Sequence, residues 1–213
     1  MEINPDIISE YCAHHSTRPS SLCDELEAFT KENVAMSVML SGPVVGSFLG
    51  FMVSLLKAKT VIEIGTYTGY SALCMAERLP SDGRLISVDI NEETVRIAKR
   101  FWARSKFGSQ IESQIGDATR LIPLINGPVD FVFIDADKAG YRTYLDLVSQ
   151  KLSDHGVIVA DNALYSGEVL NPGMASPGGK ALADFNDYVI NHSLFESVLL
   201  PVRDGLQVIK RRT

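Results

Sequence analysis

Carboxylates follow the apolar runs in the central part of the sequence, which predicts a polar rim along one edge of a sheet. The side chains that stand at or just beyond the ends of these runs are Asp89, Asp117, Asp135 and Asp161, and Glu63 lies inside the first run. Ligands of open parallel sheets bind at the carboxyl ends of the strands. A buried carboxylate costs free energy unless it has a role there. These residues are therefore the first candidates for a functional site.

A glycine turn follows the first apolar run. Gly65 and Gly69 allow a sharp turn and a close approach to a ligand. Thr66 lies within this turn and Ser71 in the first turn of the next helix, where backbone N–H groups face outward as donors. The glycine spacing matches neither the dinucleotide fingerprint nor a P-loop. The turn alone therefore fits a plain strand-to-helix connection as well as a ligand site.

Asp89 ends the second apolar run, about 20 residues beyond the glycine turn, where an acidic residue suits hydrogen bonding to ribose hydroxyls. Its alternative role is to cap the helix that begins near Glu92. Asp117 has a similar alternative, because it precedes another expected helix. Together, the three strand ends favour a cofactor that carries an adenosine group.

A second group of oxygen-bearing side chains follows the fourth and fifth runs, namely Asp135, Asp137, Asp161 and Asn162. Neighbouring carboxylates repel and raise one another's pKa unless a cation lies between them. Ligands that offer only oxygen suit Mg²⁺, Ca²⁺ or Mn²⁺ rather than zinc. The alternative is structural, with Asp137 capping a helix and Asp161-Asn162 forming a turn.

Lys138 directly follows Asp137 and lies at the start of an expected helix, where the helix dipole disfavours a cation. One interpretation is a salt bridge to the neighbouring aspartates. The other is a catalytic base whose pKa is lowered by a bound metal and by the helix terminus.

The elements that position these residues alternate between strand and helix. We expect strands at 60–64, 85–88, 111–114, 129–134 and 157–160, followed by a hairpin of 195–200 and 206–210 around Asp204-Gly205. The helices expected between them are 70–79, 92–105, 118–125, 141–151 and 180–190. Continuous apolar strands indicate a parallel sheet with helices on both faces. We predict one domain over 1–213, in which 1–57 is a helical prelude with helices at 3–14, 21–31 and 43–57.

Composition narrows the class of protein. The 213 residues suit one domain, and the net charge of −6 argues against a nucleic-acid partner. No basic stretch followed by an apolar core opens the sequence, so we expect a cytoplasmic protein. Residues 34–56 carry no charge and are long enough to span a membrane. Ser41-Gly42-Pro43 instead favours a short extended piece, a helix cap and a buried helix, with no membrane partner.

Six motifs in order resemble the cation-dependent O-methyltransferases of the caffeoyl-CoA and catechol types. The motifs are Glu63 to Ser71, Val88-Asp89-Ile90, Gly116-Asp117-Ala118, Phe133 to Lys138, Asp161-Asn162 and Leu200 to Gly205. The resemblance covers about Met39 to the C-terminus. It implies a Rossmann-like α/β methyltransferase fold, whose seven-stranded sheet is mostly parallel with an antiparallel last strand.

The resemblance also implies S-adenosylmethionine (SAM), a divalent cation (Mg²⁺ foremost, Ca²⁺ or Mn²⁺ otherwise) and roles for individual residues. Expected cofactor contacts are Met39, Ser41, Glu63, Gly65, Thr66, Ser71, Asp89, Ile90, Asp117, Ala118 and Asp135. Asp135, Asp161 and Asn162 would hold the cation, and Lys138 would act as the base beside Asp135. The run from Gly42 to Val45 departs from a more polar stretch in the family. The family is usually dimeric, which implies a homodimer.

The function we predict is methylation of one hydroxyl of a small phenolic compound with two adjacent hydroxyls. The loop at 163–179 and the prelude would shape the acceptor pocket, where Tyr165 either stacks on an aromatic ring or packs against its neighbours. Methylation of a modified tRNA base is an alternative within the fold. A non-catalytic nucleotide-binding module is an alternative of another class. The glycine spacing disfavours a dehydrogenase.

Overall fold

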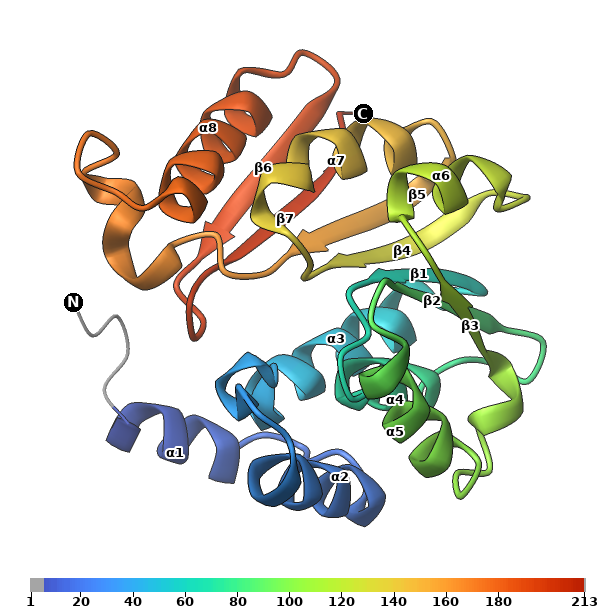
Figure 1. The fold of residues 1–213 in the computed structure, drawn as a ribbon. Helices are drawn as coiled ribbons and strands as arrows, with labels where there is room; N and C mark the ends of the chain where they lie inside the picture. Colours follow the sequence, from blue (N-terminus) through green and yellow to red (C-terminus); the bar gives the residue numbers. More distant parts are fainter. Residues whose placement is uncertain (1–5, 213) are drawn as a thin grey trace.

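Seven strands form one mixed sheet in the computed structural model, which describes residues 6–212 (Figure 1). The strands are β1 (Thr60–Ile64), β2 (Arg84–Asp89), β3 (Ile111–Ile115), β4 (Val129–Ile134), β5 (Leu152–Ala160), β6 (Phe195–Leu200) and β7 (Leu206–Arg211). Their order is β3-β2-β1-β4-β5-β7-β6. The first five pair in parallel, whereas β7 is antiparallel to both β5 and β6. The predicted Rossmann-like sheet is confirmed.

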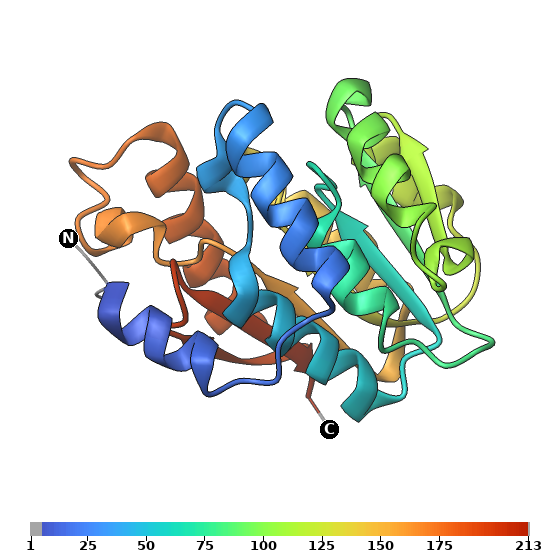
Figure 2. The ribbon, with the colours of Figure 1, turned by 90° about the horizontal axis from the view of Figure 1, so that it is seen from below.

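Helices cover both faces of this sheet (Figures 1 and 2). The helices on one side are α2 (Ser21–Asn33), α3 (Gly42–Leu56), α4 (Tyr70–Ala76) and α5 (Glu92–Trp102), with α1 (Asp6–His14) outside them; those on the other are α6 (Ala118–Leu121), α7 (Tyr141–Ser149) and α8 (Pro177–Asn191). Each face of the sheet carries a hydrophobic core: the first lies under α3 and α4, and the second under α7 and α8. Val61 packs in the first core and Ile62 in the second, because successive residues of a strand face opposite sides of the sheet. Because the strands are buried on both faces of the sheet, their positions are fixed, and so are the positions of their carboxyl ends.

Several boundaries differ from those expected. β5 begins at Leu152, five residues before the predicted start at 157, because exposed polar residues in its first half hide a strand that pairs with β4. α6 has only four residues and passes into a 3₁₀ turn (Ile122–Leu124) that contains Pro123, which lacks a donor for the helical ladder. The predicted helix at 3–14 begins at Asp6, and residues 3–5 lie outside the described residues.

The stretch before α3 is not the extended piece that we expected. Met36 has a left-handed backbone (φ 60°), and a 3₁₀ turn follows at Ser37–Met39. Ser41 stands at the N-cap position of α3 and Pro43 in its first turn, as predicted, but the Ser41 side chain makes no capping hydrogen bond. Ser37–Leu56 is long and apolar enough to cross a membrane by composition alone. However, Leu49 and Val53 are fully buried in the core, so we assign α3 to the fold.

Candidate active site

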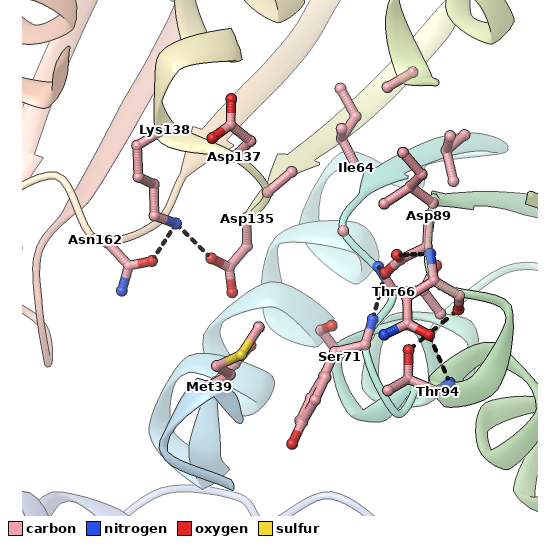
Figure 3. Close-up of a pocket in the computed structure, with 18 of the residues that line it drawn as sticks. Met39, Ile64, Thr66, Ser71, Asp89, Thr94, Asp135, Asp137, Lys138 and Asn162 are labelled. Atoms are coloured by element: carbon pink, nitrogen blue, oxygen red, sulfur yellow. Dashed lines mark hydrogen bonds and ion pairs between the residues drawn. The ribbon is translucent and has the colours of Figure 1, made fainter. Parts of the chain in front are cut away.

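A cavity of about 750 Å³ opens at the carboxyl ends of the strands (Figure 3). Backbone hydrogen bonds hold these strand ends side by side. The N–H of Gly65 donates to the Val88 carbonyl at 2.9 Å, and the N–H of Asp135 donates to the Ile64 carbonyl at 2.8 Å. The N–H of Asp161 continues the series across β4 and β5. The sheet therefore brings the glycine turn and the acidic residues to one rim, as the sequence predicts.

Asp89 holds the glycine turn in place. The backbone N–H groups of Thr66 and Tyr67 each donate to Asp89 Oδ2 at 2.8 Å, and the N–H of Asn91 donates to Oδ1. Asp89 does not cap α5, since that role falls to Asn91, whose side chain accepts from the N–H of Thr94. The carboxylate therefore joins β2 to the turn, while it also lines the cavity.

Glu63 is fully buried on β1, directly beside Ser87 of β2. The hydroxyls of Ser71, at 2.6 Å, and Ser87 both donate to its carboxyl group, and the Ser87 hydroxyl also meets that of Thr66. Burial raises the pKa of Glu63 to about 8 from an ordinary value of 4.5, so the group is mostly protonated at neutral pH. Glu63 lies behind the cavity wall, whereas its partner Ser71 is part of that wall.

The other residues expected at the cofactor all line the cavity. They are Met39, Ser41, Gly65, Thr66, Ser71, Asp89, Ile90, Asp117, Ala118 and Asp135. Asp117 also caps α6, because its Oδ1 accepts from the backbone N–H and the hydroxyl of Thr119. A helix cap and a cofactor contact are therefore compatible roles for Asp117. The contacts of all ten residues with a cofactor stay predictions.

The cavity is also lined by residues that the sequence did not single out for the site. They include Tyr67, Asn91, Thr94, Tyr144 and Arg203. Thr94 follows the cap of α5 by three residues, so it faces the rim once the helix forms. Arg203 comes from the hairpin between β6 and β7, and only the tertiary fold brings it here. No short motif in the sequence marks Thr94, and Arg203 lies within the motif from Leu200 to Gly205 but was not singled out there as a site residue.

Lys138 lies at the centre of the second group, as Figure 3 shows. Its Nζ donates to Asp135 Oδ1 at 3.0 Å and to Asn162 Oδ1 at 2.6 Å. It also donates to the buried hydroxyl of Tyr141 at 2.8 Å. Asp137 precedes the 3₁₀ turn at Lys138–Gly140 but makes no side-chain cap there, so the structural alternative for this residue is wrong. The ion pair foreseen for Lys138 exists, and the amine also faces the cavity where a base would act.

Asp161 is fully buried beneath this group, next to Asn162. Its Oδ1 accepts from the Asn162 N–H at 2.7 Å, but its Oδ2 has no hydrogen-bond partner and lies 3.8 Å from Arg203 Nη1. Burial raises the pKa of Asp161 to about 7, and the charge of Asp135 acts in the same direction. A buried carboxylate oxygen without a hydrogen bond is a costly arrangement that a cation would relieve.

The donor set fits a hard divalent cation by its chemistry. Asp135, Asp161 and Asn162 offer carboxylate and amide oxygens, the ligands that Mg²⁺, Ca²⁺ and Mn²⁺ prefer. Within residues 6–212 no group of three or more His, Cys, Asp or Glu side chains is arranged for a metal, and this set contains only two carboxylates. The fit therefore depends on the amide oxygen of Asn162 as the third ligand.

Comparisons with known proteins agree with this fold. The sequence profile of a family described as O-methyltransferase matches residues 13–212. A probable caffeoyl-CoA O-methyltransferase 2 of Dictyostelium discoideum is 33% identical over 99% of this chain and 94% of its own length. The caffeoyl-CoA O-methyltransferase of Petroselinum crispum is 32% identical over 98% and 92%. The crystal structure of SAH-bound PaMTH1, a methyltransferase of Podospora anserina, superposes with a TM-score of 0.90 at 25% identity, covering 98% of this chain and 95% of that one.

Proposed function

Since this chain belongs to the O-methyltransferase family, we propose that it methylates one hydroxyl of an aromatic compound with two adjacent hydroxyls, in a reaction that depends on a divalent cation. The chain is a SAM-dependent enzyme of the caffeoyl-CoA O-methyltransferase type. The acceptor and the cation are the parts that we propose. Support for the acceptor comes from the relatives, whose names give a caffeoyl group, which carries two adjacent hydroxyls.

One observation carries the proposal. Among the described residues, the fully buried Oδ2 of Asp161 accepts no hydrogen bond and has only the Arg203 guanidinium, 3.8 Å away, as a charge partner. Asp161 lies beside Asp135 and Asn162, and backbone hydrogen bonds join these strand ends to the glycine turn. A plain cofactor-binding module has no need for a buried carboxylate in this position. A divalent cation bound by Asp135, Asp161 and Asn162 would lower the pKa of an acceptor hydroxyl.

The protein's own residues account for the remaining steps. Lys138 Nζ reaches the cavity, where it would take the proton of the acceptor hydroxyl. Asp89 fixes the glycine turn against which SAM, the methyl donor, would lie. The acceptor oxygen and the methyl carbon must be aligned, and this alignment supplies much of the acceleration. The fixed contact between the glycine turn and Asp135 serves that purpose.

The acceptor side of the cavity is formed by segments from both ends of the chain. Met39 and Val38 come from the 3₁₀ turn before α3, and Tyr165 and Ser166 from the loop after β5. Tyr165 also packs against the second core, so its ring is at least partly structural. We propose that these mainly apolar side chains receive the aromatic ring of the acceptor.

A substrate panel tests this function. Catechols, flavonoids and phenolic thioesters would be incubated with SAM and Mg²⁺, Mn²⁺ or EDTA. We expect methylation of compounds with two adjacent hydroxyls, little with their single-hydroxyl analogues, and loss of activity in EDTA. Methyl transfer that persists in EDTA, or in an Asp135→Ala variant, would refute the cation-dependent mechanism.

The same assay separates the alternatives. Unmodified and modified tRNA would be included as acceptors. The net charge of −6, and the pairing of Glu25 with exposed Arg104 just beyond the end of α5, argue against an RNA surface at this end of the molecule. SAM binding in calorimetry without turnover on any acceptor would instead indicate a non-catalytic module. We also propose that the protein is a cytoplasmic homodimer.

A further inference from the structure

Asp204 lies in the turn between β6 and β7 and contacts the chain that leaves β5 at several points. Its Oδ2 accepts from Asn162 Nδ2 at 3.4 Å, and its Oδ1 accepts from the Ser166 N–H at 2.5 Å. Its backbone carbonyl accepts from the N–H of Leu164 at 2.8 Å. Asp204 thus touches both the predicted cation ligand Asn162 and the loop that lines the acceptor side.

The side-chain amide of Asn162 has opposite partners at its two ends. Its oxygen accepts from Lys138 Nζ at 2.6 Å, whereas its NH₂ group faces the Asp204 carboxylate. A reversed amide would place the NH₂ group against the lysine ammonium and the oxygen against a carboxylate. Both contacts would be repulsive, because lysine has only donors and an ionised carboxylate only acceptors. The two neighbours therefore select the same orientation.

This orientation matters because only the oxygen of an amide binds a hard cation. Asp161 and Asp135 present carboxylates, whose two oxygens are chemically equivalent, so Asn162 is the one ligand of the three that must be turned the right way. Lys138 selects that orientation from the cavity side. Asp204 selects the same orientation from the opposite side of the amide. Its hydrogen bond would therefore keep Asn162 in this orientation if Lys138 moved away.

Asp204 also restrains the loop at the acceptor side. Tyr165 and Ser166 both have left-handed backbones, with φ of 44° and 52°, which non-glycine residues adopt only when their surroundings hold them there. The Asp204 carboxylate accepts from the N–H of Ser166, at the centre of this strained pair. One side chain therefore joins the predicted cation ligand to the acceptor loop.

We propose that Asp204 is a positioning residue that fixes the Asn162 oxygen toward the cation site. This inference rests on the cation dependence proposed above, and it concerns binding before any reaction takes place. Outer partners of metal ligands orient those ligands, and their loss commonly weakens metal affinity by about 10- to 100-fold. We expect a loss of this size when Asp204 is removed.

A double-mutant cycle on Mn²⁺ binding tests the inference. The dissociation constant would be measured by electron paramagnetic resonance for wild type, Asp204→Ala, Asn162→Asp and the double variant. We expect Asp204→Ala to weaken binding about tenfold or more in the wild-type background. In the Asn162→Asp background it should have no more than about a twofold effect, or should tighten binding, because a carboxylate needs no orientation.

The controls separate orientation from general support of the hairpin. If Asp204→Ala weakened Mn²⁺ binding equally in both backgrounds, its role would be structural and the inference would be overturned. Wild type without Mn²⁺ affinity would overturn the proposed cation site as well. Asp184→Ala, an exposed residue of α8, removes the same charge and should leave Mn²⁺ affinity unchanged. If Asp204→Ala does not fold, Asp204→Leu enters the same cycle, since it keeps a similar side-chain volume but has no acceptor oxygen.

Discussion

Gly65 and Asp135 meet so closely that a β-carbon on residue 65 would lie 1.9 Å from the Asp135 carbonyl oxygen. Gly65 belongs to the glycine turn after β1, and Asp135 to the predicted cation site after β4. The N–H of Asp135 also donates to the carbonyl of Ile64, one residue before the turn. The two halves of the site are therefore joined backbone to backbone, and a displacement of one displaces the other.

Gly65→Ala should damage folding and cofactor binding together. The residue has φ of +100°, which alanine rarely adopts, and its methyl group would collide with the backbone of Asp135. We expect a loss of more than about 3 kcal/mol in the free energy of unfolding, from strain and displacement combined. Chemical denaturation and calorimetry of SAM binding would measure both effects.

Gly127→Ala is the matched control for this change. Gly127 has a similar φ of +91°, but the nearest atom to its added β-carbon is 4.0 Å away, at the end of the Arg84 side chain. Only the backbone strain remains, so we expect a loss of about 1–2 kcal/mol with unchanged SAM affinity. Equal losses in the two variants would show that the contact with Asp135 is unimportant.

Asp89→Ala should weaken SAM binding through the glycine turn as well as through any direct contact. The substitution removes the acceptor of two backbone N–H groups, those of Thr66 and Tyr67. Hydrogen bonds to a charged group contribute about 1.5–3 kcal/mol each, so we expect SAM affinity to fall by at least about tenfold. Calorimetry would measure it, with Asp117→Ala for comparison. Asp117 also lines the cavity, but it caps a helix of only four residues, so we expect a smaller loss of SAM affinity there than at Asp89. A larger loss at Asp117 would contradict the role given to Asp89.

The sequence predicted most of the strands and the rim of carboxylates, because continuous apolar runs and their polar ends are local signals. Glu63 shows where local reasoning stopped. Its position inside an apolar run marked it as unusual. However, the hydroxyls that donate to its carboxyl group come from β2 and α4, which only the folded sheet brings together. Likewise, Asp204 was visible only as a hairpin residue. Its contact with Asn162 spans 42 positions and depends on β7 lying beside β5.

Glu63 should make the cofactor-free protein less stable as pH rises. Its pKa is about 8 in the folded chain and near 4.5 when exposed, so the folded state binds an extra proton between these values. The contribution is fully present below about pH 4.5 and is lost as pH rises through about 8. Glu63→Gln cannot titrate. The free energy of unfolding of wild type relative to this variant should therefore fall by several kcal/mol between pH 5 and pH 9. A constant difference would show that Glu63 is ionised throughout.

We expect a homodimer that uses the outer face of α3. Phe51 and Leu55 lie one helical turn apart and are 64% and 63% exposed, which is unusual for neighbouring large apolar side chains. Light scattering should give twice the chain mass of 23.3 kDa. Phe51→Glu and Leu55→Glu should give the mass of one chain. Ile190→Glu, at a 60% exposed position on α8 across the sheet, should remain dimeric. A monomeric wild type would contradict this expectation.

Lys138→Met and Lys138→Arg together decide whether Lys138 is the base or only a charge partner of Asp135. The ammonium group lies 3.0 Å from Asp135 Oδ1 and 2.8 Å from the Tyr141 hydroxyl, so both roles agree with its position. General bases commonly contribute about 10²–10⁴-fold to a rate. If Lys138 is the base, neither methionine nor arginine can substitute for it, because arginine keeps the charge but does not release its proton at neutral pH. We expect single-turnover methylation of a catechol to fall at least about 100-fold in both variants, with SAM affinity nearly unchanged. If the arginine variant retained most of the rate while the methionine variant lost it, Lys138 would act through its charge alone.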